Sequence, residues 1–512
     1  MRWVERVEFG LLLGALLGTV SCSGGDDESN REETAPPVSP EDFTPPPSSC
    51  EVPELPAALG TERVVGTGTA DSCTEQALRD ALSKGGDITF DCGPVPVTIV
   101  VAAELAVPVD ASLDGDELIT LDGGGRTRIL HSEARVNLTV QRLSFVRGRA
   151  VPTDDVLGSG GAIRVGWLGT LHVHDCAFAD NAADDEGIEG GGAIYQSNGG
   201  RLTVVDSSFE RNSAISGGAI DNLLSPMTIV GSTFVDNESF AGGGAVYDDG
   251  ASAEIDDDVG GDIDICGCHF EGNHTLETGG AVYLWAYPGD RFLINQCSFI
   301  GNSAVRSGDS SALGGALRTG NAPLQLAGSL FADNHADVHG GAYWTRGNYP
   351  ATIVNCTFVS NDAGVEGEEG GYGGAVSGFN VQLDHVTMVG NHAEFGGGAI
   401  SNEGDEWSMN NSILANNTAS NPWDQNHNCV SLLPGSNNLQ WPAPEGNDPL
   451  CSTNAIIADP RLGELADNGG ATQTIAPAAD SPALDAGTHC AATDQRGEPR
   501  SDPCDLGAFE VQ

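Results

Sequence analysis

The chain has 512 residues, of which 70 are glycine and only 6% are aromatic, and its 73 acidic and 22 basic residues give a formal net charge of −51. This glycine content is too high for a typical globular domain, and the sequence lacks the triplet period of collagen. Such an acidic surface repels phosphate backbones and anionic lipid headgroups, so we expect no nucleic-acid partner.

Residues 1–22 read MRWVERVEFGLLLGALLGTVSC, with an apolar run from Leu11 to Val20 before Cys22. The run is too short to span a bilayer and is typical of a secretory signal. Because it ends at a cysteine, the segment resembles a bacterial lipoprotein signal, which implies that Cys22 is acylated after cleavage. We therefore expect an outer-membrane lipoprotein of the cell envelope, surface-exposed or extracellular, that touches the membrane only through this lipid anchor. Ordinary secretion is the alternative.

Residues 23–55 are rich in proline, serine and acidic side chains and contain almost nothing to bury, which predicts a disordered tether. One short amphipathic helix is predicted next, with Ser72 and Glu75 as a capping box and Gly85 ending it. Its apolar face consists of Ala77, Leu78, Ala81 and Leu82. We expect this helix to cap the open end of the repeats that follow.

A two-part motif then recurs along most of the chain. Its first part, Phe-x-x-Asn, ends at Asn181, Asn212, Asn237, Asn273, Asn302, Asn334 and Asn361, with degenerate copies at Asn391 and Asn417. Its second part, Gly-Gly-Ala and an apolar residue, contains Ala162, Ala193, Ala219, Ala245, Ala281, Ala316, Ala342, Ala375 and Ala399. Copies are about 24 to 36 residues apart, a period typical of solenoids, propellers and arrays.

Short apolar runs at strand spacing, with no helical stripe between them, favour an all-β parallel β-helix over residues 56–420. Neighbouring repeats would then stack about 4.8 Å apart. We expect each repeat Phe to stack on the next inside the core, and each Asn to hydrogen-bond the bend and the neighbouring repeat. The Asn is expected to tolerate a left-handed backbone at the bend, and Gly-Gly to supply positive φ or close backbone approach.

The alternation of Phe-x-x-Asn with Gly-Gly-Ala-Ile over roughly residues 140–420 resembles the repeats of chlamydial polymorphic membrane proteins and their right-handed parallel β-helix relatives. This resemblance implies a right-handed, pectin-lyase-like solenoid. The segment DSCTEQALRDAL also resembles the Cys-Ser-Leu-Arg-Glu-Ala-Ile type of start found in many bacterial surface β-helix proteins.

Four ordered blocks follow the repeats: ADPRLGELADNGGATQT, SPALDAG, TDQRGEPR and DLGAFE. They resemble the choice-of-anchor Q domain of bacterial surface proteins, whose members hold an anchoring signal elsewhere in the chain. In this chain, a lipidated Cys22 would supply the anchoring signal. The Pro- and Gly-rich residues 421–512 are predicted to form a disulfide-pinned cap region.

Thirteen cysteines minus a lipidated Cys22 leave an even number, which suits disulfides in an oxidising compartment. Short intervening loops favour the pairs Cys73–Cys92, Cys429–Cys451 and Cys490–Cys504. Four further cysteines lie two residues before a repeat Phe and are interpreted as small buried thiols: Cys176, Cys268, Cys297 and Cys356. A Cys268–Cys297 bond between adjacent repeats is the alternative. The pairing of six cysteines stays open: Cys50, Cys176, Cys266, Cys268, Cys297 and Cys356.

Two sets of side chains are candidates for ligand binding. The insertion YDDGASAEIDDDVGGDIDIC offers carboxylates at Asp256, Asp257, Asp258, Asp262 and Asp264. Their oxygens could bind Ca²⁺, but the spacing matches no defined loop, and a solvated acidic loop is the plainer interpretation.

The residue after the Gly-Gly-Ala-apolar group should point outward, and rings at or near that position are Tyr195, Tyr247, Tyr283, Trp285 and Trp344. Such rings could stack on sugars, or pack on neighbouring loops.

Catalysis is not indicated by these patterns. Glycoside hydrolysis needs two facing carboxylates, and lyase chemistry needs a base. The ordered pattern of polygalacturonases is missing, and the sole lysine, Lys84, precedes the repeats. The sequence therefore favours a non-catalytic surface β-helix protein for adhesion or for binding a polysaccharide or a surface protein. A polysaccharide lyase or glycoside hydrolase is the second hypothesis, and a purely structural envelope protein is the third.

Overall fold

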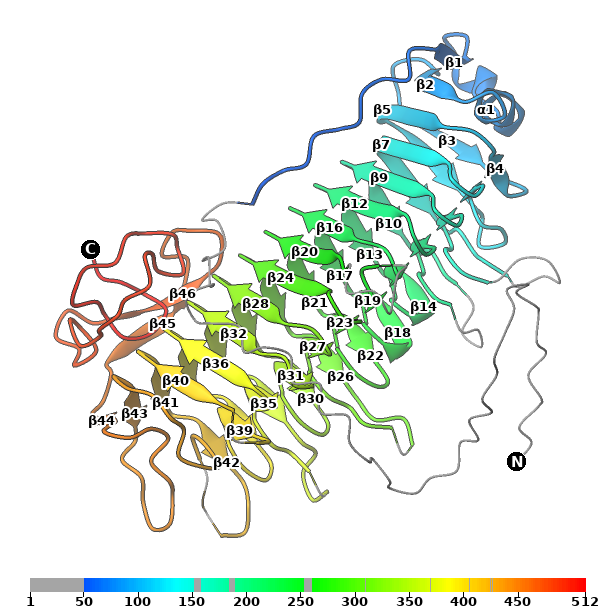
Figure 1. The fold of residues 1–512 in the computed structure, drawn as a ribbon. Coiled ribbons are helices and arrows are strands. Elements are labelled where there is room, and N and C mark those ends of the chain that lie inside the picture. Colours follow the sequence, from blue (N-terminus) through cyan, green and yellow to red (C-terminus); the bar gives the residue numbers. More distant parts are fainter. Residues whose placement is uncertain are drawn as a thin grey trace. The chain divides into compact units, whose positions relative to one another are not determined.

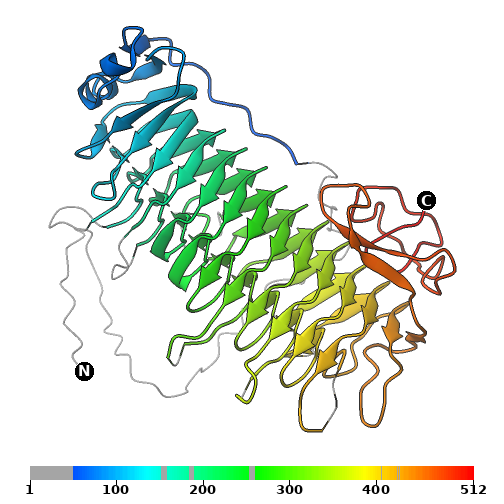
Figure 2. The same cartoon turned by 180° about the vertical axis from the view of Figure 1, so that it is seen from behind.

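The computed structural model describes residues 50–512 except 152–157, 184–188, 253–259, 309, 369, 405, 424 and 426. Nearly all regular structure in these residues is β, arranged as three long parallel sheets (Figures 1 and 2), with a single α-helix. Within this part of the chain, no helix is long and apolar enough to cross a membrane.

The helix α1 (Glu75–Leu82) follows a 3₁₀ turn at Ala70–Ser72. Its capping residue is Thr74, whose Oγ1 accepts a hydrogen bond from the Ala77 N–H at 3.2 Å. The predicted cap at Ser72 is therefore wrong by two residues, since Ser72 belongs to the turn before the helix. The predicted apolar face is confirmed, because Leu78, Ala81 and Leu82 are buried in the main core cluster and Ala77 packs against it.

The large sheet receives two short strands, separated by a bend, from most repeats. Its first strands are β1 (Glu62–Gly66), β2 (Gly86–Asp91), β3 (Val97–Val100), β5 (Ala111–Asp122) and β7 (Asn137–Val146). The strands before the bend are β9 (Thr170–His174), β12 (Arg201–Val205), β16 (Met227–Val230), β20 (Asp262–Cys266), β24 (Arg291–Asn295), β28 (Leu324–Ala327), β32 (Ala351–Val354), β36 (Val381–Asp384) and β40 (Ser408–Asn410). The strands after it are β10 (Ala177–Ala179), β13 (Ser208–Glu210), β17 (Thr233–Val235), β21 (His269–Glu271), β25 (Ser298–Ile300), β29 (Leu330–Ala332), β33 (Thr357–Val359), β37 (Thr387–Val389), β41 (Ile413–Ala415), β43 (Leu439–Trp441) and β44 (Ile456–Ile457).

The second sheet contains two strands that come before the first Gly-Gly-Ala group, and then the strand that follows each of these groups. They are β4 (Leu105–Val107), β6 (Leu130–Ser132), β8 (Ile163–Val165), β11 (Ile194–Gln196), β15 (Ile220–Leu223), β19 (Val246–Asp249), β23 (Val282–Trp285), β27 (Leu317–Gly320), β31 (Tyr343–Arg346), β35 (Val376–Gly378) and β39 (Ile400–Asn402). The third sheet contains the short strands that follow the repeat asparagines from Asn212 to Asn417. They are β14 (Ser213–Ser216), β18 (Glu238–Gly242), β22 (His274–Thr275), β26 (Ser303–Ala304), β30 (His335–Ala336), β34 (Asp362–Ala363), β38 (His392–Ala393) and β42 (Thr418–Ala419).

Consecutive repeats pair in register, so each position of the motif forms a row across its sheet. Phe209, Phe234 and Phe270 are aligned in this way, and successive phenylalanine rings from Phe145 to Phe358 stack at 4.7 to 4.9 Å between centroids. The predicted stack is confirmed. The row is also fully buried, so it is part of the core that holds neighbouring repeats together.

The repeat asparagines form a second buried row. Asn302 Nδ2 donates to Phe270 O and to Asn334 Oδ1, both at 3.0 Å, while its own Oδ1 accepts from Asn273 N and Nδ2. The expected bonding to both bend and neighbour is thus confirmed. The expected left-handed backbone at the Asn is wrong, because the residue before it takes that conformation, as Asp236 does at φ 52° before Asn237.

Glycines of the Gly-Gly-Ala group meet two separate steric demands. Gly243 has φ +59°, which side chains rarely adopt. At Gly244 a Cβ atom would lie 2.0 Å from the carbonyl oxygen of Gly280 in the next repeat. Both glycines are therefore fixed by the backbone and not by a ligand.

The disulfides include the three expected pairs, Cys73–Cys92, Cys429–Cys451 and Cys490–Cys504. A fourth joins Cys50 to Cys266 at the end of β20, and residues from Cys50 onward run beside the large sheet toward β1 (Figure 1). The end of the predicted tether is therefore fixed to the repeats. The alternative Cys268–Cys297 bond is wrong, because Cys176, Cys268, Cys297 and Cys356 are buried free thiols.

Residues after 420 divide into two parts that the predicted cap region did not separate. The strands β43 and β44 extend the large sheet beyond β41, so the repeats continue past the predicted boundary. The remaining residues include the antiparallel pair β45 (Leu462–Ala466) and β46 (Thr474–Pro477) and lie against the side of the large sheet (Figure 1). Thr357 Oγ1 donates to Gln495 Oε1 at 2.6 Å, and Ala508 N donates to Thr387 Oγ1 at 2.9 Å. This region thus covers a face of the repeats.

Candidate functional site: the outer row of the second sheet

One row of the second sheet collects rings and charges on the side away from the core. The pairing of strands β8 to β39 aligns, in order, Arg164, Tyr195, Asp221, Tyr247, Tyr283, Arg318, Trp344, Ser377 and Ser401. The neighbouring positions toward the N-terminus are buried apolar residues such as Ile194 and Val246, so alternation along the strand places this row on the opposite face. We call it the outer row.

Aromatic side chains cluster at the middle of the outer row. The rings of Tyr247 and Tyr283 stack with their centroids 4.7 Å apart and their planes 10° from parallel. Trp285 lies two residues after Tyr283 on β23, and a Cβ atom at Gly320 on the next strand would lie 2.7 Å from its ring. Both tyrosines and Trp285 are partly exposed, so the cluster presents ring surface to solvent.

Arg318 lies within this cluster and was not singled out from the sequence. Its guanidinium carbon is 4.3 Å from the centre of the Tyr283 ring and 5.4 Å from the centres of the Trp285 and Trp344 rings. These distances are within the range of cation–π attraction. Burial lowers the pKa of Arg318, whereas the interaction with the neighbouring Tyr283 hydroxyl raises it. The sequence did contain a signal, because Arg318 follows Gly-Gly-Ala-Leu where Tyr283 follows Gly-Gly-Ala-Val.

A second series of rings continues from the cluster at the turn that enters the second sheet. His339, Tyr372, Phe395 and Trp423 make successive ring contacts with centroid distances of 5.4, 5.0 and 5.6 Å. Glu403 lies at the outer row, since its Oε1 accepts hydrogen bonds from Trp344 Nε1 at 3.4 Å and from Ser377 Oγ at 3.3 Å. Ring surface thus extends over several repeats, an arrangement suited to an elongated ligand.

At the N-terminal end of the outer row, the ring of Tyr195 is not exposed as the sequence predicted. Tyr195 is only 1% exposed and has the Arg164 guanidinium 5.4 Å from its ring centre, so it offers no free face. Trp344 is also buried, at 5% exposure. Asp221, between the tyrosines, accepts hydrogen bonds from Ser216 Oγ at 2.6 Å and Gly190 N at 2.8 Å. Burial raises the pKa of this carboxyl group to about 7.

The predicted calcium ligands are not brought together among the residues described. Asp256, Asp257 and Asp258 lie outside them. Asp262 forms an ion pair with Arg291 at 2.8 Å, and burial raises the pKa of Asp264 two residues later on β20. In the described ranges, the one group of potential metal ligands close enough to share an ion contains His385, Cys490 and Cys504, and its two cysteines form a disulfide.

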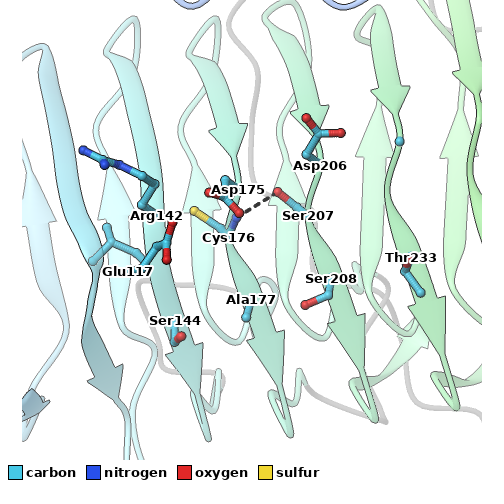
Figure 3. Close-up of a pocket in the computed structure, with 12 residues that line it drawn as sticks. Glu117, Arg142, Ser144, Asp175, Cys176, Ala177, Asp206, Ser207, Ser208 and Thr233 are labelled. Atoms are coloured by element: carbon cyan, nitrogen blue, oxygen red, sulfur yellow. Dashed lines mark hydrogen bonds between the residues drawn. The ribbon is translucent and has the colours of Figure 1, made fainter. Parts of the chain in front are cut away.

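A shallow depression of about 250 Å³ lies at the bend of the large sheet (Figure 3). Glu117, Arg142, Asp175 and Asp206 border it on successive repeats. The Arg142 guanidinium already pairs with Asp114 and Asp116. Burial raises the pKa of the Cys176 thiol to about 12, so this thiol is not a nucleophile near neutral pH. The Cys176 N–H donates to Ser207 Oγ at 3.1 Å, which explains the Ser or Cys found two residues before the repeat phenylalanines from Phe178 to Phe358.

No family model matches this chain, and no curated protein matches it in sequence.

Proposed function

We propose that this chain is a non-catalytic lipoprotein of the outer cell surface that binds an extracellular glycan through the outer row. In this proposal, acylated Cys22 holds the chain at the membrane and the residues before Cys50 separate the repeats from the bilayer. The repeats wind as a right-handed, pectin-lyase-like parallel β-helix. The motif resemblance and the in-register pairing of every repeat support that fold.

The observation that carries the proposal is the grouping of Tyr247, Tyr283 and Trp285 on the outer face of one sheet. Their rings have no place in the buried core, where the repeat phenylalanines stack separately. Large rings that remain partly exposed on a regular surface favour a binding role, since each ring leaves apolar area in contact with water. Sugar rings present flat C–H faces of matching character.

Retention on immobilised polysaccharides tests this function. The full chain, purified in mild detergent from cells that produce it, is passed over a panel of polysaccharides while new reducing ends are assayed in the same samples. We expect retention without new ends. New reducing ends would show catalysis and overturn the non-catalytic assignment, and passage through every column without retention would overturn glycan binding.

One observation favours the enzyme as the second candidate function. Burial raises the pKa of Asp221 to about 7, and the nearby Glu189 contributes to this rise. Glycoside hydrolysis requires two carboxyl groups close to each other, and Asp221 and Glu189 are such a pair. Asp221 is only 5% exposed, however, and its carboxyl group is already engaged by Ser216 and Gly190. In the enzyme case, Asp221→Asn would abolish the new reducing ends.

A further inference from the structure

Arg318 is a buried cation without a matching anion. The residue is 9% exposed, and its Nε and Nη1 atoms are buried and make no hydrogen bond. Among the residues that the structure describes, no carboxylate forms an ion pair with it, although the chain has 73 acidic residues. Burying a charge and leaving its donors unpaired is costly, and cation–π contacts recover only part of that cost.

Other buried arginines in the chain have carboxylate partners. The side chains of Arg128 and Arg500 are 3% and 0% exposed, and they pair with Glu104 and Glu510, respectively. Exposed arginines such as Arg211 and Arg291 also lie against acidic residues. Arg318 therefore departs from the pattern of its own chain, at the position where partly exposed rings gather.

We propose that Arg318 receives an anionic group of the ligand, a carboxylate or a sulfate on a sugar, while Tyr283 and Trp285 hold the adjoining sugar ring. This inference rests on the proposed function and specifies its ligand as an acidic glycan. The guanidinium fork matches a carboxylate or sulfate because two parallel N–H groups can meet two oxygens. Nε and Nη1 of Arg318 have no partner among the described residues and remain available to donate to the anion.

The anion reaches the guanidinium past Trp285 in this proposal. Trp285 is partly exposed and packs over Gly320, which has no side chain, and its ring is in cation–π range of Arg318, whereas Trp344 is buried. Movement of the Trp285 ring would open the donors without disturbing the strands. Binding should therefore change tryptophan fluorescence, and Trp285→Phe should remove most of that change.

Non-specific attraction cannot imitate this site. A chain with a net charge of −51 repels polyanions at long range, so retention of an acidic glycan requires a local contact. The binding assay uses moderate salt, which screens the repulsion between the chain and the polymer over about 8 to 10 Å. Arg291, which pairs with Asp262 on the large sheet, provides a control for the loss of one positive charge.

Three immobilised polymers test the inference with the full chain: alginate, which carries carboxylates, dextran sulfate, and uncharged dextran. We expect retention on one or both acidic polymers and none on dextran, with the stronger of the two identifying the anion. Arg318→Gln should weaken this binding by about tenfold or more, because a hydrogen bond to a charged group is lost. Arg318→Lys should restore part of it, and Arg291→Gln should leave it unchanged.

Competition on the unaltered protein keeps the test independent of how the variants fold. Glucuronic acid or glucose sulfate should displace the bound polymer, and glucose at the same concentration should not. Equal retention on dextran with no effect of Arg318→Gln would overturn the acidic ligand while leaving glycan binding in place. If the chain is retained neither on these polymers nor on any neutral glycan, both the acidic ligand and glycan binding are overturned.

Discussion

The guanidinium carbon of Arg318 lies 4.3 Å from the centre of the Tyr283 ring, and that ring is stacked on Tyr247 at 4.7 Å. These three residues come from consecutive repeats, and in-register pairing alone brings them together. The repeat is thus the scaffold, and the residues that depart from it on the outer face form the candidate site. Predictions about the scaffold and about the site can be separated for this reason.

The asparagine row should be a major source of stability. Asn302→Ala removes the acceptor for Asn273 N and Nδ2 and the donor to Phe270 O, all in the buried core. Each unsatisfied group costs about 1 to 3 kcal/mol, so we expect the free energy of unfolding to fall by roughly 3 kcal/mol or more. Urea denaturation measures this loss. Asn348→Ala, at an exposed position, is the control, and a similar small effect for both variants would refute a structural role for the row.

The Cys50–Cys266 disulfide should hold the first described residues against the large sheet. It closes a loop over a sequence separation of 216 residues. Cys50→Ser should therefore reduce the free energy of unfolding by about 2 to 5 kcal/mol and expose the chain near residue 50 to proteases. Unfolding curves and limited proteolysis read out both effects. Cys176→Ser replaces a free buried thiol with the residue found at equivalent positions and should change neither.

Asp221 should make stability depend on pH in a defined direction. Its pKa is about 7 in the folded chain and about 3.9 when unfolded, so the folded state holds the extra proton between these values. The free energy of unfolding of the wild-type chain, relative to that of Asp221→Asn, is therefore highest below about pH 4. It declines by on the order of 4 kcal/mol as the pH rises to about 7. Unfolding of both proteins across this range measures the difference. A difference that does not change with pH would contradict the buried, protonated state of Asp221.

The lipid anchor is tested at Cys22. Cys22→Ser should abolish labelling by a radioactive fatty acid and move the protein from the membrane fraction to the soluble fraction. The thioether and amide-linked chains of a bacterial lipoprotein supply the membrane affinity, so nothing else in the proposal would retain the variant. An unlabelled wild-type protein would contradict the lipoprotein assignment and favour ordinary secretion.

The sequence predicted those features that each repeat determines locally. Phe234, Asn237 and Gly244 recur at every repeat because core stacking, bend hydrogen bonds and close backbone approach recur there, and repetition made them visible. The helix α1 was placed correctly, but its cap was assigned to Ser72 in place of Thr74, since both residues suit that role.

Contacts that occur only once in the chain could not be predicted from the period of the repeats. The disulfide partner of Cys50 depends on how the chain near Cys50 runs beside the sheet. The hydrogen bond from Ala508 N to Thr387 Oγ1 depends on where the final residues fold back. The candidate site was predicted in part. Tyr247, Tyr283 and Trp285 were found from their position after Gly-Gly-Ala, whereas Arg318 was missed because only rings were sought there.

The most direct test of the central claim is the affinity of a retained polysaccharide for the full chain and for the double variant Tyr283→Ala and Trp285→Ala. Titration calorimetry at fixed salt gives this value, and Trp167→Ala, which removes a 48% exposed ring outside the outer row, is the matched control. We expect at least about a tenfold loss of affinity for the double variant, because stacking rings contribute about 0.5 to 1.5 kcal/mol each beyond their buried area. We expect no loss for the control. Equal affinities for wild type and double variant, with both folded, would refute glycan binding by these rings.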